Sequence, residues 1–514
     1  MPMPTIYRYV FTVIVLLFFA SSSHSQGIQS DTLDIKFVVE TTLSKNVNIK
    51  LKEQDVLNAR GTYLNDYGSF DPTFNASLGY NQVYTPEYVD DVLLNPLIGT
   101  STYSLGLTKP FIWGGNLSLL LQMTRTVDTL DYHLPPNLAT VGLQFELPLL
   151  QGLGEDGTGG DVLTDEYNLK AEGKQYVFTI SEQILNSVQS YWNYLGAKRS
   201  LEIIEKSLAE AQEFYEENQT LSQNDNIPGS DLTALLATIS QKKIDLLNAK
   251  QTLYSARQTL GLNMGLDFEN IDQLPPPKSR FLFEELLILD SAFIVSLPIN
   301  SIVEIALNNR QDYMANLDQV TANEYQVKKA ENGTLSELDL TLSAGYTGIT
   351  EGKKFDEYFN PFYKNVEGLN FGATLSYTLP FGNNNAEGTL LTSKAQYLQS
   401  KINAVEKKRQ IRSSVTVQLK QFQTYYLSFL ESERIVAYNL KALADEKMKM
   451  KMGTSNSINV DYIERNLLAA QLANIQAMQN LANSIVRIRY ETGTIVNSKG
   501  EVNYVNINNL LSFR

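Results

Sequence analysis

Two long stretches of the sequence place apolar residues at alternating spacings of four and three, the heptad rhythm of helices that pack together over many turns. The first extends from about Asp161 to Leu221 and the second from about Ala386 to Met452. Their stripes include Ile184, Val188, Tyr191 and Leu195 in the first, and Leu419, Phe422, Tyr426 and Phe429 in the second. Neither stretch contains proline, which costs a helix interior about 3 kcal/mol. At about 1.5 Å per residue, helices of about 60 residues extend about 90 Å, too long for a compact domain.

Each long helix is predicted to turn and come back. Asn224 to Ser230 interrupts the first pattern, and Gly453 can close the second helix. Residues suited to capping the return helices are Ser230 or Asp231 in the first hairpin and Ser457 or Asn459 in the second. The return helices then end near Leu262 and Tyr490. Taken alone, these two antiparallel hairpins fit an ordinary coiled-coil protein.

Four other segments alternate apolar and polar residues with a period of two. They lie at residues 74–80, 139–147, 338–347 and 369–379. Such alternation suits the strands of a membrane barrel, where one face meets lipid and every backbone group is paired within a closed sheet. A half-buried sheet of a water-soluble protein gives the same pattern. Because each of the four segments neighbours a long helix, the set favours the barrel.

The two halves of the chain align with each other at a nearly constant offset. Residues 143–150 align with 375–382 at an offset of 232, 189–194 with 420–425 at 231, and 231–232 with 461–462 at 230. This regularity indicates an internal duplication. Upstream, residues 78–80 align with 344–346 at 266 instead, so the first half carries 34 extra residues. They predict an added hairpin at about 101–126, joined through Gly114 and Gly115, and whether it enters the barrel stays open.

The N-terminus predicts export. An apolar run of 12 residues, Tyr9 to Ala20, follows Arg8 and precedes a serine-rich stretch. It is too short to cross about 30 Å of hydrocarbon as a helix, so residues 1–25 are predicted to be a secretory signal peptide. Its removal changes the formal net charge from −14 to −15, and such a surface repels nucleic acid.

Composition argues against an enzyme. The chain has no cysteine and two histidines, of which His24 leaves with the signal and His133 lies in a predicted loop. Thiolate metal sites, disulfides and histidine-based catalysis are thereby excluded. The phosphate-cradling GxxxxGK[ST] motif is missing, and no pair of carboxylates stands out from the solvated helix faces. We predict no catalytic residues, no metal site and no cofactor.

The order of elements resembles the TolC family of outer-membrane efflux and secretion channels over nearly the entire mature chain. After the signal, helix, strand, strand, long helix and return helix occur twice. The local marks are residues 147–152, 379–382, 306–312 and 453–461. The resemblance implies an α+β membrane protein that forms a homotrimer, each chain lending four strands to a shared 12-stranded transmembrane β-barrel above a helical periplasmic tunnel. It also implies contact with outer-membrane lipid, a periplasmic adaptor protein and an inner-membrane pump.

The pattern and the resemblance together divide the chain into five parts. These are the signal peptide at 1–25, a first repeat at 26–262, an equatorial segment at 263–298, a second repeat at 299–491 and a C-terminal equatorial segment at 492–514. The equatorial segments lack a heptad, and the first contains three consecutive prolines, Pro275 to Pro277. The resemblance implies that they surround the middle of the tunnel.

Candidate functional residues lie at the two helical turns. Asp225, Asp231 and Asp461 are predicted at the periplasmic constriction, where threefold symmetry would make rings of carboxylates that attract cations. The alternative interpretation makes Asp231 and Asp461 helix caps, or negative charges that interact favourably with the positive helix N-termini. The residues predicted to contact the adaptor are Gly229, Ser230, Gly453, Thr454, Ser455 and Ser457.

The function expected is that of a passive exit duct in a tripartite efflux pump or type I secretion system, located in the outer membrane and extending into the periplasm. It would export small molecules or polypeptides, with energy supplied by the pump. The alternative is a non-transport periplasmic or surface coiled-coil protein that acts as a structural spacer. The sequence does not select among drugs, metals and secreted proteins as the cargo.

Overall fold

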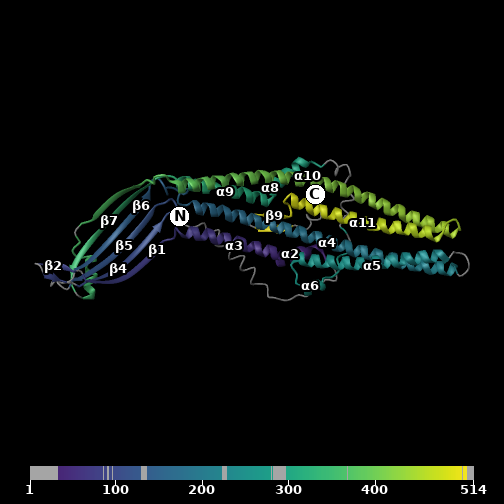
Figure 1. Ribbon diagram of the computed structural model, residues 1–514, viewed down its shortest axis with the longest axis horizontal. Coiled ribbons are helices and arrows are strands. Elements are labelled where there is room, and N and C mark those ends of the chain that lie inside the picture. Colours follow the sequence, from purple (N-terminus) through teal and green to yellow (C-terminus); the bar gives the residue numbers. More distant parts are fainter. Residues whose placement is uncertain are drawn as a thin grey trace. The chain divides into compact units, whose positions relative to one another are not determined.

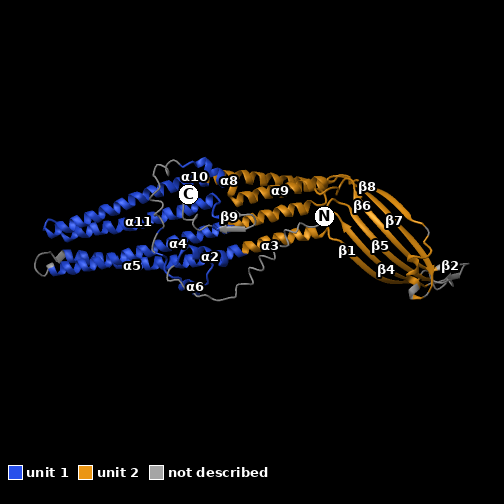
Figure 2. Cartoon of the chain, turned by 180° about the vertical axis from the view of Figure 1, so that it is seen from behind, with its two compact units in different colours: residues 1–50, 179–306, 414–514 blue, residues 51–178, 307–413 orange. Residues whose placement is uncertain are grey.

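The computed structural model describes residues 33–84, 86–89, 92–94, 97–128, 136–222, 229–278, 281, 297–352, 354–366, 368–499 and 502–505 (Figure 1). The predicted signal peptide, His133 and Asp225 lie outside these residues. Two compact units are distinguished by colour in Figure 2. Unit 1 comprises residues 1–50, 179–306 and 414–514, and unit 2 comprises residues 51–178 and 307–413. None of the described helices is both long enough and apolar enough to cross a lipid bilayer.

Unit 2 contains a six-stranded antiparallel sheet. Its strands, in spatial order, are β1 (Thr73–Tyr84), β4 (Leu97–Pro110), β5 (Asn116–Asp128), β6 (Pro136–Pro148), β7 (Glu337–Glu351) and β8 (Asn370–Thr378). Figure 2 labels these strands, which lie side by side from β1 to β8. The four predicted strands are therefore present as β1, β6, β7 and β8, and β1, β6 and β7 are longer than the alternation alone indicated.

The predicted extra hairpin is a full member of this sheet. It consists of β4 and β5, which pair over their whole length and lie between β1 and β6. The turn between them uses Gly114 at a φ of +100°, a conformation that favours glycine, and the Phe111 amide donates to the Gly115 carbonyl at 2.7 Å. The resemblance implies four barrel strands per chain, whereas the sheet formed by the described residues has six strands.

Two short excursions complete the strand region. Between β1 and β4, the strands β2 (Glu87–Val89) and β3 (Val92–Leu94) form a small hairpin. Between β7 and β8, the 3-10 helices η2 (Phe355–Tyr358) and η3 (Asn360–Phe362) fold back on the sheet, where the Tyr346 hydroxyl donates to the Phe362 carbonyl at 3.2 Å. Arg125 of β5 lies over the ring of Tyr358 in the same loop.

Ion pairs join the helices of unit 2. The elements are α3 (Val47–Gly68), the first part of α4 (Gly160–Ser222), the end of α8 (Ile299–Asn309), α9 (Gln311–Asn332) and the first part of α10 (Asn384–Lys451). Lys52 of α3 meets Glu172 of α4 at 2.6 Å, Lys174 of α4 meets Asp318 of α9 at 2.5 Å, and Lys394 of α10 meets Glu331 of α9 at 3.0 Å. Tyr167 stacks on Tyr325 between α4 and α9. These contacts set α4 beside α3 and α9, and α9 beside α10.

Unit 1 holds the two predicted helical hairpins. The long helix α4 is followed by α5 (Gly229–Met264), and the long helix α10 is followed by α11 (Ser457–Glu491). All four helices agree with their predicted bounds to within two residues. The heptad stripes are the buried residues, because Ile184, Leu195 and Leu419 are fully enclosed.

Smaller elements pack on the hairpins within unit 1. The helices α2 (Ile35–Lys45) and α6 (Phe268–Asp272) contact α5, and the strands β9 (Val496–Lys499) and β10 (Val502–Val505) pair with each other. Asn46 donates from its side chain to the Asn263 carbonyl at 2.7 Å, which ties the end of α2 to the end of α5. The Leu33 amide donates to the Pro276 carbonyl in the proline-rich segment.

Candidate functional site at the helical turns

The turn of the second hairpin begins with a glycine. Gly453 has a φ of +75°, its amide donates to the Met450 carbonyl at 3.0 Å, and the Thr454 amide donates to the Lys449 carbonyl at 2.9 Å. This pair of bonds is the Schellman arrangement, which satisfies carbonyls that a helix end leaves unpaired. The prediction that Gly453 closes the long helix is confirmed.

The return helix starts one residue earlier than its predicted caps. Asn456 has an extended backbone, and its side chain accepts from the Asn459 amide at 3.0 Å. Asn456 is therefore the cap of α11, and the prediction of Ser457 or Asn459 was wrong. All three residue types cap helices well, so the backbone conformation at Asn456 decides which one acts.

The N-terminal parts of α5 and α11 are joined by polar contacts. The Ser457 hydroxyl donates to Asp231 Oδ2 at 3.2 Å, and the Thr238 hydroxyl donates to Asp461 Oδ2 at 3.2 Å. Between these two bonds, Leu235 of α5 and Val460 of α11 are buried together with Phe214 of α4 in one apolar cluster. The two return helices therefore begin beside each other, with alternating polar and apolar contacts.

Asp461 is a packed residue and not a helix cap. It is the fifth residue of α11, is 7% exposed, and also pairs with Arg465 Nε at 3.2 Å. Asp231 lies in the first turn of α5, where a negative charge is favourable at the positive end of a helix. The capping interpretation is thus wrong for Asp461, while Asp231 fits a favourable interaction with the helix N-terminus.

One turn further along, the same helices enclose a charged layer. Lys242 of α5 is 3% exposed and donates to the Ser207 hydroxyl of α4. Glu464 of α11, also buried, pairs with Lys447 of α10 at 2.8 Å. Burial lowers the pKa of the Lys242 ammonium, and the nearby carboxylates of Glu464 and Asp461 only partly oppose that effect.

Lys242 is not among the residues predicted from the sequence, although its spacing from neighbouring apolar residues indicates burial. Leu235, Ile239 and Lys242 follow the spacing of four and three that marks a buried heptad stripe. A lysine in such a stripe specifies alignment between helices at a cost in stability. The layer therefore fixes the register of α4, α5, α10 and α11 at this level.

The remaining predicted site residues differ in accessibility. Gly453 and Thr454 are exposed, and Ser455 is half-buried with its hydroxyl bonded to Glu446. Ser457 is 1% exposed. Gly229 and Ser230 form the start of α5, and their side chains lie outside the described set, as does Asp225. The structure thus brings Asp231, Ser457 and Asp461 together and leaves the Gly453 turn open to solvent.

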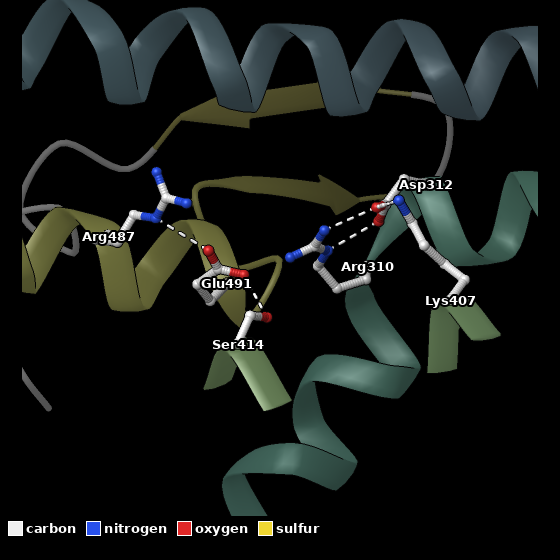
Figure 3. A network of polar contacts seen from close by, with 6 residues as sticks. All are labelled: Arg310, Asp312, Lys407, Ser414, Arg487 and Glu491. Atoms are coloured by element: carbon white, nitrogen blue, oxygen red, sulfur yellow. Dashed lines mark hydrogen bonds and ion pairs between the residues drawn. The ribbon is translucent and has the colours of Figure 1, made fainter. Parts of the chain in front are cut away.

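Figure 3 draws two further polar groups, one belonging to each unit. In unit 2, the Arg310 guanidinium donates two hydrogen bonds to the Asp312 carboxylate, at 2.8 and 2.7 Å. Lys407 forms an ion pair with the same carboxylate at 2.8 Å. Burial raises the pKa of the Asp312 carboxyl, but Arg310 and Lys407 outweigh it, so the net direction is down. This pair explains the sequence mark at residues 306–312 as a helix junction. In unit 1, Glu491 accepts from Ser414 at 2.9 Å and pairs with Arg487 at 3.0 Å.

No described group of three or more histidine, aspartate or glutamate side chains is arranged to hold a metal ion. Two of the ion pairs above connect helices, Lys407 with Asp312 and Lys447 with Glu464, whereas Arg310 with Asp312 and Arg487 with Glu491 are local pairs. The described site is therefore a junction of helices held by hydrogen bonds, ion pairs and one apolar cluster.

Solved structures of outer membrane channels share this fold. The Campylobacter jejuni CmeC outer membrane channel matches with a TM-score of 0.64 at 17% identity, covering 92% of this chain and 93% of that one. The Vibrio cholerae outer membrane protein VceC matches with a TM-score of 0.65 at 14% identity over 89% and 96%. The open state of the Neisseria gonorrhoeae MtrE outer membrane channel matches with a TM-score of 0.60 at 13% identity over 92% and 93%. No protein-family model and no curated protein sequence matches the chain.

Proposed function

Because the chain has the fold of the outer membrane channels, the fold that its resemblance to the TolC family predicted, we propose that it is itself such a channel. It lies in the outer membrane and extends into the periplasm. It acts as the passive exit duct of a tripartite efflux pump or a type I secretion system. It is not an enzyme, and the cargo consists of small molecules or polypeptides delivered by a pump.

The observation that carries this proposal is the sheet of unit 2, which has one apolar face and one polar face. Leucine, phenylalanine and tyrosine side chains gather on one face, and serine, threonine, asparagine and glycine on the other. Strands of 9 to 15 residues are long enough to cross the hydrocarbon layer at a tilt. The apolar face suits lipid and the polar face suits a water-filled passage.

An open six-stranded sheet cannot by itself form a transmembrane barrel. In hydrocarbon every backbone amide and carbonyl has to be paired, so an open sheet needs partners at both edges. Copies of the same chain supply them in a homotrimer, and the helical hairpins of three copies then form the periplasmic tunnel. This arrangement supports a duct that is closed along its wall and open at its ends.

The turn of the second hairpin supports docking of a periplasmic adaptor. Gly453, Thr454 and Ser455 stand beyond the end of α10 and retain exposed surface. Gly229 and Ser230 occupy the corresponding start of α5. Ser457 is not part of this proposed surface, because it is buried against Asp231.

The contacts between α5 and α11 support a gate. Asp231 and Asp461 each accept a hydrogen bond across these two helices, so breaking either bond loosens the helix ends. With three copies, the aspartates Asp225, Asp231 and Asp461 would each occur three times around one axis. Closely spaced carboxylates in such rings favour cations over anions.

Single-channel recording in planar bilayers tests this function. The purified protein is expected to give small conductance steps, and Asp461→Ala is expected to enlarge them because α11 loses its hydrogen bond to Thr238 of α5. Asp445→Ala is the matched control, since Asp445 is an exposed aspartate on α10. Unchanged conductance in Asp461→Ala removes that residue from the gate. Absence of any channel, with the mature protein in the aqueous fraction, favours the coiled-coil spacer instead.

A further inference from the structure

The hairpin of β4 and β5 is built into the middle of the sheet and is not attached at its edge. Strand β1 pairs with β4 along its whole length from Thr73 to Tyr84, and β5 pairs with β6 from Asn116 to Arg125. Removing the hairpin from the wall would break both ladders. The strand order therefore requires β4 and β5 wherever β1 and β6 are part of one sheet.

The two faces of the sheet continue through the hairpin without a change of side. One row of directly paired residues crosses all six strands on the apolar face: Phe74, Leu107, Leu119, Leu143, Ala344 and Phe371. The neighbouring row on the opposite face is Thr73, Thr108, Ser118, Gln144, Ser343 and Gly372. A hairpin that stood outside the wall would have no reason to keep this alternation. The hairpin matches the sequence pattern of the four strands around it.

The edge strands β1 and β8 have the same alternation of apolar and polar residues as the inner strands. In the part of the chain that the structure describes, each pairs with a strand of this sheet on one side only. On β1, Leu78 is 81% exposed, and on β8, Phe371 is 77% exposed, although each lies on the apolar face. Strand β1 leads away from α3 and β8 leads toward α10, so β1 of one copy would run antiparallel to β8 of another. Antiparallel strands with matching faces are what a closed ladder requires.

We propose that β1 of one copy pairs with β8 of the next, so that three copies close a wall of 18 strands, six from each chain. This inference rests on the proposed function, because it takes the trimer in the outer membrane as given. It replaces the 12 strands that the resemblance implied. The partner at each edge is a second copy of this chain.

The larger strand number sets the kind of cargo that the membrane section accepts. Barrel diameter grows roughly linearly with strand number, so 18 strands give a diameter about 1.5 times that of 12, and barrels of about 16 to 18 strands enclose an aqueous channel. The charged side chains on the inward face are all acidic and lie near the ends of their strands: Asp128, Glu146, Glu337, Asp339 and Glu351. The strand section is therefore wide enough for bulky hydrated solutes, and the carboxylates at its two ends favour cations over anions.

Disulfide trapping tests the seam directly, since the chain has no cysteine of its own. Directly opposed residues on antiparallel strands have Cα atoms about 4.5 to 5.5 Å apart, which is within the range that a disulfide spans. Ser77→Cys on the inward face of β1 is combined in turn with Asn370→Cys, Thr374→Cys and Ser376→Cys on the inward face of β8. Membranes carrying each pair are oxidised and the chains are separated without reductant.

The expected result is a ladder of two and three linked chains for one of these pairs. The matched control combines Ser77→Cys with Ala373→Cys or Leu375→Cys, which point to the other face, and it should give at least fivefold less linked product. Ser77→Cys with Ser104→Cys is the reference within one chain, because the two hydroxyls are 2.7 Å apart. Its closure shows that β1 and β4 remain paired in the membrane.

Two results would overturn the proposal. A bond between Ser77→Cys and Gln144→Cys would mean that β1 meets β6 directly and that the hairpin leaves the wall. A preparation that conducts but gives no bond between chains at any β1 and β8 pair would reject this seam and leave the channel function standing. If conductance is also missing and the protein is found in the aqueous fraction, the proposed function fails together with the seam.

Discussion

At the scale of single residues, Lys242 shows how a buried charge can hold helices in register at the expense of stability. It lies between Ser207 of α4 and the carboxylates of Asp461 and Glu464 on α11. Those carboxylates have other partners, Arg465 and Lys447. The ammonium is therefore not needed to neutralise them, and its desolvation is only partly offset.

We expect Lys242→Met to stabilise the helical region by about 1 kcal/mol at pH 7, because methionine fills similar volume without a buried charge. The pKa of Lys242 is lowered in the folded state, so the unfolded chain binds the extra proton between that lowered pKa and the ordinary 10.5. Wild-type stability at this residue then rises with pH through that window. The thermal midpoint of the variant, followed by circular dichroism, should exceed that of the wild type at pH 7 and approach it near pH 10.5. A difference that is constant with pH would contradict the assignment.

The same scale shows what a sequence can and cannot say about a site. Asp231 and Asp461 were chosen because they lie at matching turns, and both do face the junction of α5 and α11. The pairing of Asp231 with Ser457 and of Asp461 with Thr238 could not be predicted. Hydrogen bonds between helices depend on the rotation and register of both helices, which the sequence of one helix does not specify. Lys242 could have been found from its place in the heptad stripe.

At the scale of elements, the turn at Gly453 depends on one backbone conformation. A Cβ added to Gly453 would meet no atom within 4 Å, so substitution there costs only backbone strain at a φ of +75°. We expect Gly453→Ala to destabilise the turn by about 1 kcal/mol. Gly388→Ala is the matched control, because Gly388 lies inside α10 with equally open space and alanine favours a helix interior by about 1 kcal/mol.

Opposite signs are the expected outcome of this comparison. Amide hydrogen exchange at Thr454, whose amide donates to Lys449, should accelerate about fivefold in Gly453→Ala and stay unchanged in Gly388→Ala. Equal exchange in both variants would show that the left-handed conformation is not what holds this turn. Thermal midpoints measured on both proteins give the accompanying stability difference.

Element boundaries were easier to predict than element partners. The long helices were found to within two residues because Pro148 and Pro228 limit the first, and Pro380 and Gly453 limit the second. The strands were found from their alternation, but alternation carries no information about which strand lies next to which. That is why the hairpin of β4 and β5 could be predicted while its position between β1 and β6 could not.

At the scale of the whole molecule, the fold depends more on the order of its helices and strands than on sequence identity. CmeC shares the fold at 17% identity, so most side chains have changed while the succession of strand, long helix and return helix persists. Heptad and period-two patterns survive such change because they need only an apolar residue at each position and not a particular one. Cargo and partners depend on particular residues, which neither periodic pattern specifies.

The choice between a membrane wall and a water-soluble spacer can be settled on one strand of the sheet. Leu78→Lys places a charge on the apolar face of β1, where a lipid-facing lysine at the bilayer midplane costs about 2 to 4 kcal/mol. Ser77→Lys, the matched variant, places the same charge one residue away on the polar face. We expect Leu78→Lys to reduce the amount of assembled trimer in outer-membrane fractions at least tenfold, and Ser77→Lys to leave it within twofold of the wild type. In a water-soluble spacer, an exposed leucine replaced by lysine would leave the yield unchanged or raise it, so equal recovery of both variants would exclude a lipid-facing role for this face.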